Sequence, residues 1–279
     1  MSAVSLGRHC GRALAGGTIL VLAGISSAWP SCPNSGSATS RVASVSERLE
    51  VRLDDGRVVR LAGLDAPDPG RGDPETASRA RAFLTQLLVG RDASVAVLAP
   101  RPDRWNRILG DLFVVGPASD QKSSALALLT AGFARVRPEV ETRDCRGARL
   151  AAENSARAQG LGLWTDPYYS VARASDSADL RARDGLFAIV EGKVLRVGVG
   201  RSRYYMDFGR RGAFTATIPK RQEKLFGRAG FNLTALAGAS LRMRGALDNR
   251  FGLRMEIVDP QQIERIDASE GNKEAVPQR

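Results

Sequence analysis

Residues 58–68, VVRLAGLDAPD, decide the fold and the chemistry that the chain can support. The segment begins as a strand that carries Arg60, and Gly63 permits a sharp turn directly after it. Asp65 and Asp68 then stand on either side of a proline, whose ring fixes the backbone. The pattern therefore predicts two carboxylates and a guanidinium held close together at the end of a strand.

The segments around this stretch predict an α+β domain. Apolar and charged residues alternate through LEVRLD at 49–54, and the following Asp55-Gly56 is typical of a hairpin turn. Helical spacing predicts helices over 75–88, 124–131 and 148–159, and apolar runs predict strands over 93–98 and 108–115. Strands with interposed and following helices favour a β-barrel-rich α+β domain over residues 45–165.

A second β-rich block follows a polar linker, which we predict over residues 166–184. Strands are predicted at 188–199, 204–209, 213–219, 240–247 and 252–258, with a helical stretch at 222–226. Five strands with a helix between the third and the fourth is the layout of an OB-fold. We therefore expect an OB-like β-barrel domain over 185–267, followed by a disordered tail over 268–279.

The first 28 residues are predicted to be a signal peptide. Arg8 and Arg12 precede an apolar run at 13–28, which ends in the small residues Ser-Ser-Ala. The run is shorter than the roughly 20 residues that a membrane-spanning helix needs. We therefore expect a periplasmic or secreted protein, without stable membrane insertion after cleavage and with a flexible tether over 29–44. The alternative is a protein anchored in the membrane by its N-terminal segment.

Histidine and cysteine are scarce in this chain. The one histidine, His9, lies in the predicted signal peptide, so the mature chain can form neither a Ser-His-Asp triad nor an HExxH zinc site. The chemistry must then rely on carboxylates, arginines and lysines. Cleavage leaves Cys32 and Cys145, which either form a disulfide in an oxidising compartment or remain two separate thiols.

A second charged motif, DRWNRIL at 103–109, stands at the start of a predicted strand and contributes Arg107. Two carboxylates and two guanidiniums at strand ends can surround one phosphate group. The carboxylates hold a hard cation or activate water, while the arginines bind phosphate oxygens and stabilise the charge of the transition state.

These motifs resemble those of the staphylococcal nuclease (thermonuclease) family. The family's V-R-L-x-G-I-D-A-P-E corresponds to VRLAGLDAPD, and its D-[KR]-Y-G-R-x-L corresponds to DRWNRIL. Two further signatures match LLTAGFARV at 128–136 and ARAQGLGLW at 156–164, so the resemblance covers residues 45–165. It implies an OB-fold barrel with helices and, in competent members, calcium-assisted phosphodiester hydrolysis. The second block resembles an accessory OB domain of some bacterial members.

The resemblance assigns roles to individual residues. Arg60 and Arg107 match the two arginines that bind phosphate, and Asp65 matches a metal-binding aspartate. Asp68 stands where the family has a catalytic glutamate, the proposed general base. Trp105 replaces a tyrosine of the second motif, and either stacking on a base or a buried structural role is open to it.

One metal ligand of the family is missing, so the calcium site is predicted to be incomplete. Counting back from the Asp-Gly turn, Leu49 occupies the position of a metal-binding aspartate, and leucine offers calcium no oxygen. Strand alternation directs the adjacent Glu50 to the opposite face. Glu47 lies two residues before Leu49 on the same face and is the candidate replacement ligand. Whether the chain is an enzyme is therefore left open.

The second block carries most of the positive charge, with 15 Lys and Arg against 8 Asp and Glu over 185–267. Basic and aromatic residues together on an OB-like sheet are typical of proteins that bind single-stranded nucleic acid. The candidate residues are Arg203, Tyr204, Tyr205, Arg210 and Arg211. A solvated basic surface is the alternative for this block.

The sequence leaves three functions open. The first is an exported thermonuclease-like hydrolase that cleaves single-stranded DNA or RNA with calcium through a degenerate metal site. The second is a non-catalytic protein that binds nucleic acid or another polyanion and retains the nuclease fold. The third is a structural or protein-binding module. The sequence predicts no oligomeric state.

Overall fold

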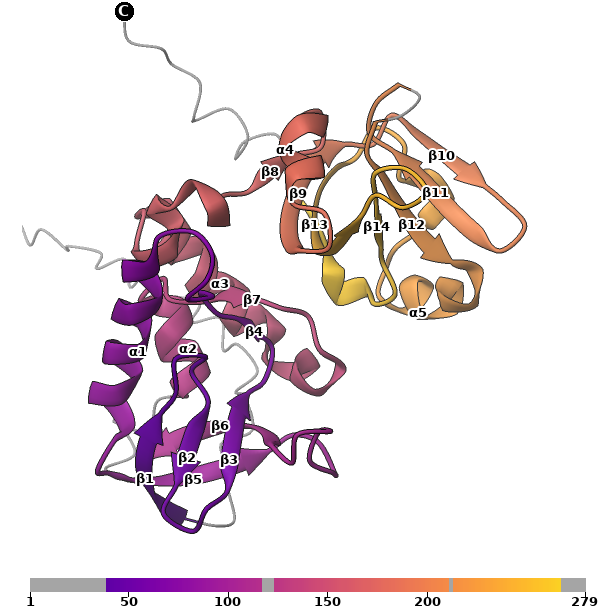
Figure 1. Cartoon of the computed structure of the whole chain (residues 1–279). Helices are drawn as coiled ribbons and strands as arrows, with labels where there is room; N and C mark the ends of the chain where they lie inside the picture. The colour runs from indigo at the N-terminus through magenta and orange to yellow at the C-terminus, as the bar shows by residue number, and fades with distance from the viewer. Residues whose placement is uncertain (1–38, 117–122, 211–212, 267–279) are drawn as a thin grey trace, which may run out of the picture.

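The computed structural model describes residues 39–116, 123–210 and 213–266, which form two units (Figure 1). The predicted signal peptide, most of the predicted tether, Cys32, Arg211 and the tail at 268–279 lie outside the described residues. Within the described ranges, every helix is too short or too polar to cross a bilayer.

The first unit is built on a closed barrel with the strand order β1-β2-β3-β6-β5. Its strands are β1 (Thr39–Val45), β2 (Val51–Leu53), β3 (Val58–Leu61), β5 (Asp92–Val97) and β6 (Ile108–Val114). The hairpin predicted around Asp55-Gly56 is present as the antiparallel pair β2–β3. β1 closes the barrel by pairing with both β2 and β5.

The barrel begins earlier in the chain than the sequence analysis placed it. Thr39, Ser40 and Arg41 pair with β5, and Val42 and Val45 are buried in the barrel core. The tether predicted over 29–44 therefore does not reach residue 44, because residues 39–44 are needed to close the sheet.

Three helices pack on the barrel, and they complete the α+β fold that the sequence predicts. They are α1 (Pro74–Leu88), α2 (Ser124–Thr130) and α3 (Arg146–Ala158). α1 begins where the Asp73 carboxylate accepts a hydrogen bond from the Glu75 amide, and its buried face includes Ala80, Leu84 and Leu88. A two-stranded ladder, β4 (Leu64–Asp65) with β7 (Arg135–Val136), joins the turn after β3 to the segment after α2. This ladder positions the candidate site.

The second unit is an eight-stranded sheet with the order β10-β11-β12-β14-β13-β9-β8, and β15 pairs with β13. Its strands are β8 (Ala172–Arg173), β9 (Phe187–Lys193), β10 (Arg196–Val199), β11 (Arg203–Asp207), β12 (Thr215–Pro219), β13 (Ser240–Asp248), β14 (Arg254–Glu256) and β15 (Ile263–Arg265). β9 ends at Lys193 and β10 begins at Arg196, yet the strands β11, β12, β14 and β13 lie between them in the sheet order. The sheet therefore curves so that β9 and β10 come close together. The helix α5 (Glu223–Arg228) lies between β12 and β13 in the chain, as expected, while the OB-like assignment stays a prediction.

Most of the segment predicted as a linker is part of the second unit. It contains β8 and the helix α4 (Ser177–Ala182), and β8 pairs in parallel with β9 through Ala172 and Val190. Leu180 of α4 is buried in the core of this unit. Residues 172–182 are therefore folded with this sheet, although their polar composition suggested a linker, while Asp166 and Tyr169 accept hydrogen bonds from Asp73 and Asp68 of the first unit.

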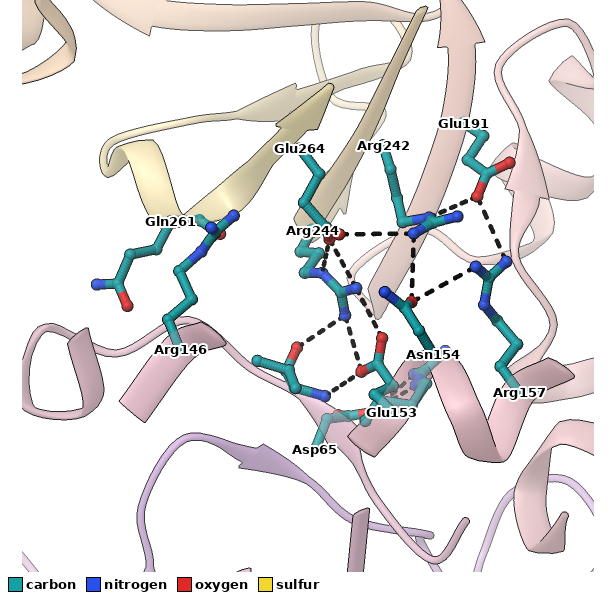
Figure 2. Close-up of polar contacts among 12 residues, drawn as sticks. Asp65, Arg146, Glu153, Asn154, Arg157, Glu191, Arg242, Arg244, Gln261 and Glu264 are labelled. Carbon is teal, nitrogen blue, oxygen red and sulfur yellow. Dashed lines mark hydrogen bonds and ion pairs between the residues drawn. The ribbon is translucent and has the colours of Figure 1, made fainter. Parts of the chain in front are cut away.

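A buried ion-pair network joins the two units (Figure 2). Arg244 of β13 reaches Glu153 of α3, with Nη2–Oε1 and Nη1–Oε2 distances of 2.7 and 2.9 Å. Arg244 Nη1 also donates to the Val136 carbonyl at 3.3 Å, and its Nε donates to Glu264 at 2.8 Å. Arg244 and Glu153 are 0% and 1% exposed. Because each of these charges is buried with a partner from the other unit, separating the units would leave both charges without that partner.

Candidate nuclease-type site

The two predicted phosphate-binding arginines share one face of the barrel wall. β3 and β6 are parallel neighbours in which Arg60 lies opposite Leu109. Arg107 stands two residues before Leu109, so strand alternation directs its side chain to the same side as that of Arg60. Val59 and Leu61 point to the other side, where they are buried in the core. The barrel therefore brings both guanidiniums to its outer surface.

Glu50 joins these arginines, contrary to the expectation that it faces away from the site. The β2–β3 hairpin pairs Val51 with Val59, and one more step of that register places Glu50 opposite Arg60. Arg107 Nη1 donates a hydrogen bond to Glu50 Oε1. The prediction for Leu49 and Glu50 assumed that one continuous strand runs through both residues. Instead, Leu49 has a φ of 59° in the turn before β2, and its side chain is buried in the core. Extending the antiparallel pairing of the hairpin back from the Asp-Gly turn would have placed Glu50 beside Arg60.

Arg107 is held by a second carboxylate, that of Asp103. Arg107 Nε and Nη2 lie 2.8 and 2.7 Å from Asp103 Oδ2. Partial burial raises the pKa of Asp103, but hydrogen bonds from Arg107 and from the Trp105 amide outweigh burial and bring this pKa down to about 2. Burial lowers the pKa of Arg107, and the two carboxylates more than compensate, so its pKa is raised. Arg107 therefore stays charged and doubly paired.

Trp105 is exposed, which excludes the buried role that the sequence analysis left open. The Trp105 side chain is 60% exposed. The Cζ atoms of Arg104 and Arg107 lie 3.8 and 4.6 Å from its ring centroid. An exposed indole with two guanidiniums against it forms a surface on which a nucleic-acid base can stack.

Asp65, the predicted metal ligand, forms an ion pair with a buried arginine. Arg135 Nε and Nη2 lie 2.9 and 2.6 Å from Asp65 Oδ2 across the β4–β7 ladder. The Arg135 side chain is only 3% exposed, and it also donates to the carbonyls of Tyr169 and Phe187. Sequence reasoning missed Arg135, although it is the one charged residue in the motif LLTAGFARV.

Arg60 is paired with Glu139, another residue that the sequence analysis did not identify. Arg60 Nη1 donates to Glu139 Oε1 at 3.1 Å, and the Gly63 amide donates to Glu139 Oε2 at 2.9 Å. The Glu139 side chain is 17% exposed. Glu139 lies 79 positions from Arg60 in the chain, and no local pattern in the sequence pointed to this contact.

Asp68, the predicted general base, is the least engaged carboxylate of the site. Its side chain is 49% exposed, and its Oδ1 accepts a hydrogen bond from the Gly70 amide at 3.0 Å. The Asp68 amide donates to the Tyr169 hydroxyl at 2.9 Å, which fixes the turn. The second carboxylate oxygen lies 3.6 Å from Arg71 Nε. Asp68 therefore has an accessible oxygen with which to accept a proton.

The carboxylates present do not fit a calcium site in this arrangement. Across the described residues, no three or more His, Cys, Asp and Glu side chains cluster so as to hold a metal ion. Calcium takes six to eight oxygen ligands. Asp65 forms an ion pair with Arg135, and Glu50 forms an ion pair with Arg107. Glu47 is exposed and lines a surface groove beside α1.

The basic and aromatic residues predicted on the second unit are only partly on its surface. Tyr204 is 5% exposed and belongs to the core, while Tyr205 is 39% exposed on the opposite face of β11. The prediction that both tyrosines bind nucleic acid is therefore wrong for Tyr204, because neighbouring residues of a strand face opposite sides. Arg203 is paired with Glu256 at 2.5 Å, and Arg210 is exposed at a groove beside β10.

The comparisons with known proteins find similarity to nuclease-like proteins over part of this chain. Residues 58–166 match the family model of staphylococcal nuclease homologues. A protein named probable endonuclease LCL3, from Phaeosphaeria nodorum (strain SN15), is 30% identical over 115 residues, which are 39% of this chain. The chain spans 38% of that relative's length. The family match confirms the nuclease-like domain that the motifs indicate, and the second unit lies outside it.

Proposed function

We propose that this chain, whose residues 58–166 form a staphylococcal nuclease-like domain, binds single-stranded DNA or RNA and hydrolyses its phosphodiester bonds. The observation that carries the proposal is the convergence of Arg60 and Arg107 on one face of the barrel wall. Guanidiniums bind the non-bridging oxygens of a phosphate and stabilise the charge that builds there in the transition state. The accessible carboxylate of Asp68 is the group that accepts a proton from the attacking water.

The same proposal places the protein outside the cytoplasm. Cys145 is disulfide-bonded, and disulfides persist in oxidising compartments such as the periplasm or the extracellular space. The export pattern of the first 28 residues supports the same location.

Hydrolysis by this site is expected to be slow. The calcium dependence implied by the family resemblance requires carboxylate oxygens, and those of Asp65, Glu50 and Asp103 are already paired with arginines. These ion pairs favour a second candidate function, in which the chain binds nucleic acid without cleaving it. In that function the arginines and the exposed Trp105 hold the strand, and Asp68 has no chemical role.

A cleavage and binding assay on the full chain separates the two functions. End-labelled single-stranded DNA and RNA are incubated with calcium or with a chelator and then analysed on denaturing and native gels. The proposed hydrolase cleaves the strand, and Asp68→Asn abolishes cleavage while binding remains. Asp54→Asn, which changes an exposed carboxylate in the β2–β3 turn, is the matched control and leaves both unchanged. A shifted but intact strand supports the binding function, and the absence of both cleavage and binding refutes both proposals.

A further inference from the structure

Glu139 occupies the place where an anion would bind to Arg60. Its two carboxylate oxygens take one hydrogen bond from the Arg60 guanidinium, at 3.1 Å, and one from the Gly63 amide, at 2.9 Å. A phosphodiester likewise presents two non-bridging oxygens, and proteins bind them with an arginine and with backbone amides of this kind. A phosphate group can use this pair of donors only after the Glu139 carboxylate has left them.

The amide of Gly63 is fixed in this position by its surroundings. Gly63 has a φ of 70°, and a side chain at this position would collide with Arg149, whose Nη1 would lie 2.4 Å from the added Cβ. That same Nη1 donates to the neighbouring Ala62 carbonyl at 2.6 Å. The Gly63 carbonyl accepts a hydrogen bond from the Arg137 amide at 3.0 Å. Because the backbone on both sides of Gly63 is held in this way, its amide remains aimed at Glu139.

The second unit holds the segment that carries Glu139. Gln261 Nε2 donates to the Glu139 carbonyl at 3.3 Å, and the same carbonyl accepts bonds from the Thr142 amide and hydroxyl. Four residues after Glu139, Arg143 forms a 2.7 Å ion pair with Asp259. Gln261 and Asp259 belong to a single capped turn of the second unit, at Asp259–Gln262. Two contacts from one turn therefore hold the Glu139 segment in place.

Glu139 also borders open space. It lines a groove of about 300 Å³ between the two units, together with Val140, Gly245 and Val258. A rotation of the Glu139 side chain toward this groove would expose the Arg60 guanidinium and the Gly63 amide without moving the barrel.

We propose that Glu139 is an intramolecular plug of the phosphate site and that the Asp259–Gln262 turn of the second unit is the latch that keeps it there. The proposal rests on the proposed function, in that the anion displacing Glu139 is a phosphate group of a nucleic-acid strand. It assigns the second unit a regulatory role, because any change that moves this turn away from the first unit weakens the hold on Glu139.

The first test measures the affinity of the full chain for a short fluorescent single-stranded oligonucleotide. Glu139→Gln keeps the size of the side chain but removes its charge, and it should tighten binding about tenfold, or about 1.4 kcal/mol. Glu141→Gln is the matched control, since it changes net charge equally on an exposed residue of the same segment. Adding Arg60→Gln to Glu139→Gln should abolish the gain. Equal gains in Glu139→Gln and Glu141→Gln, or no gain, overturn the plug.

The latch is tested with Gln261→Leu, which removes the hydrogen bond to the Glu139 carbonyl. It should tighten binding severalfold on its own and add nothing in the Glu139→Gln background, because both changes then act on the same contact. Full additivity, or no gain from Gln261→Leu alone, overturns the latch.

A separate readout keeps the plug testable if the proposed function fails. The Gly63 amide resonance is followed by NMR while inorganic phosphate is added. In Glu139→Gln phosphate should shift this resonance at a concentration about tenfold lower than in the unchanged chain, as expected when one charge-assisted competitor is removed. The same phosphate dependence in both proteins overturns the plug. If phosphate behaves as expected but neither protein binds oligonucleotide, the plug stands and the proposed nucleic-acid function is wrong.

Discussion

Replacement of Arg244 by methionine should uncouple the two units. Methionine retains an unbranched apolar side chain of moderate length but removes every hydrogen bond that the guanidinium donates. Among the described residues, Glu153, 1% exposed, would then keep the hydrogen bond from the Val136 amide and a longer-range attraction to Arg157, but no arginine in direct contact. Burial lowers the pKa of Arg244, but Glu153 and Glu264 outweigh burial and raise it, so the Arg244 guanidinium stays charged in the folded protein.

The expected cost follows from that burial. Removing one partner from a buried ion pair typically lowers the free energy of unfolding by about 3–5 kcal/mol, because the other charge is left uncompensated. Glu264 keeps a 3.5 Å contact with Arg242, so it contributes less to the loss than Glu153 does. The double variant Arg244→Met/Glu153→Gln should recover part of the loss, roughly 2 kcal/mol, since no buried charge then lacks a partner.

Urea unfolding with two probes measures both the cost and the uncoupling. Of the three tryptophans, Trp105 and Trp164 lie in the first unit and Trp29 lies outside the described residues, so the measurement uses a Trp29→Phe background, in which tryptophan fluorescence follows the first unit. Far-ultraviolet circular dichroism follows both units. The two transitions should coincide in the unchanged chain and separate in Arg244→Met. The control Arg250→Met removes a 79% exposed arginine of the same unit and should cost less than about 0.5 kcal/mol. A loss below about 1 kcal/mol with coincident transitions in Arg244→Met would refute the reasoning.

Three further predictions concern single residues. The pKa of Asp103 is about 2 against an ordinary 3.8, so its ion pair stabilises the fold above about pH 4 and is lost as the pH falls toward 2; a carboxylate carbon NMR titration with a midpoint near 4 would contradict this. Leu49→Asp should lower the free energy of unfolding by about 3 kcal/mol without raising cleavage, because Leu49 is 5% exposed in the core. If calcium restores the stability of this variant in a urea titration, the position faces a metal site instead. Cys145 is disulfide-bonded, and mass spectrometry of a non-reducing digest should link it to Cys32; a link to Cys10 would show that the predicted signal peptide is retained.

Local patterns in the sequence predicted the elements of the fold well. The Asp-Gly turn, the helix over 74–88 and the strands β11, β12, β13 and β14 have strong period or turn signals, and they lie within a few residues of the predicted ranges. The strand predicted over 188–199 is divided into β9 and β10, and the short strands β8 and β15 were not predicted. The prediction for Leu49 and Glu50 failed because alternation was extended through a turn. Leu49 takes a left-handed conformation that side chains rarely adopt, so the strand begins only at Val51.

The long-range ion pairs of the candidate site could not be predicted from the sequence. Arg60 and Glu139 are 79 positions apart, and Asp65 and Arg135 are 70 positions apart, so only the closed barrel and the β4–β7 ladder bring them together. Burial of Arg244 was hidden for a different reason. Alternation along β13 places Arg244 on the face opposite the core residues Leu241, Met243 and Leu247, and the face that it occupies packs against the first unit instead of water.

The closure of the barrel by β1 sets a lower limit on the piece of this protein that can stay in solution. The family match begins at residue 58, after β1 and β2 have ended, so a fragment cut to that match would keep only β3, β6 and β5 of the barrel. The strands β3 and β5 would then be free edges with unpaired backbone groups, which are templates for intermolecular strand addition. Proteolytic trimming of the chain past Val45 would have the same effect and would convert a closed barrel into an aggregation-prone sheet. The amino-terminal strand, which contributes no residue to the proposed chemistry, is thus what protects the nuclease-like unit from self-association.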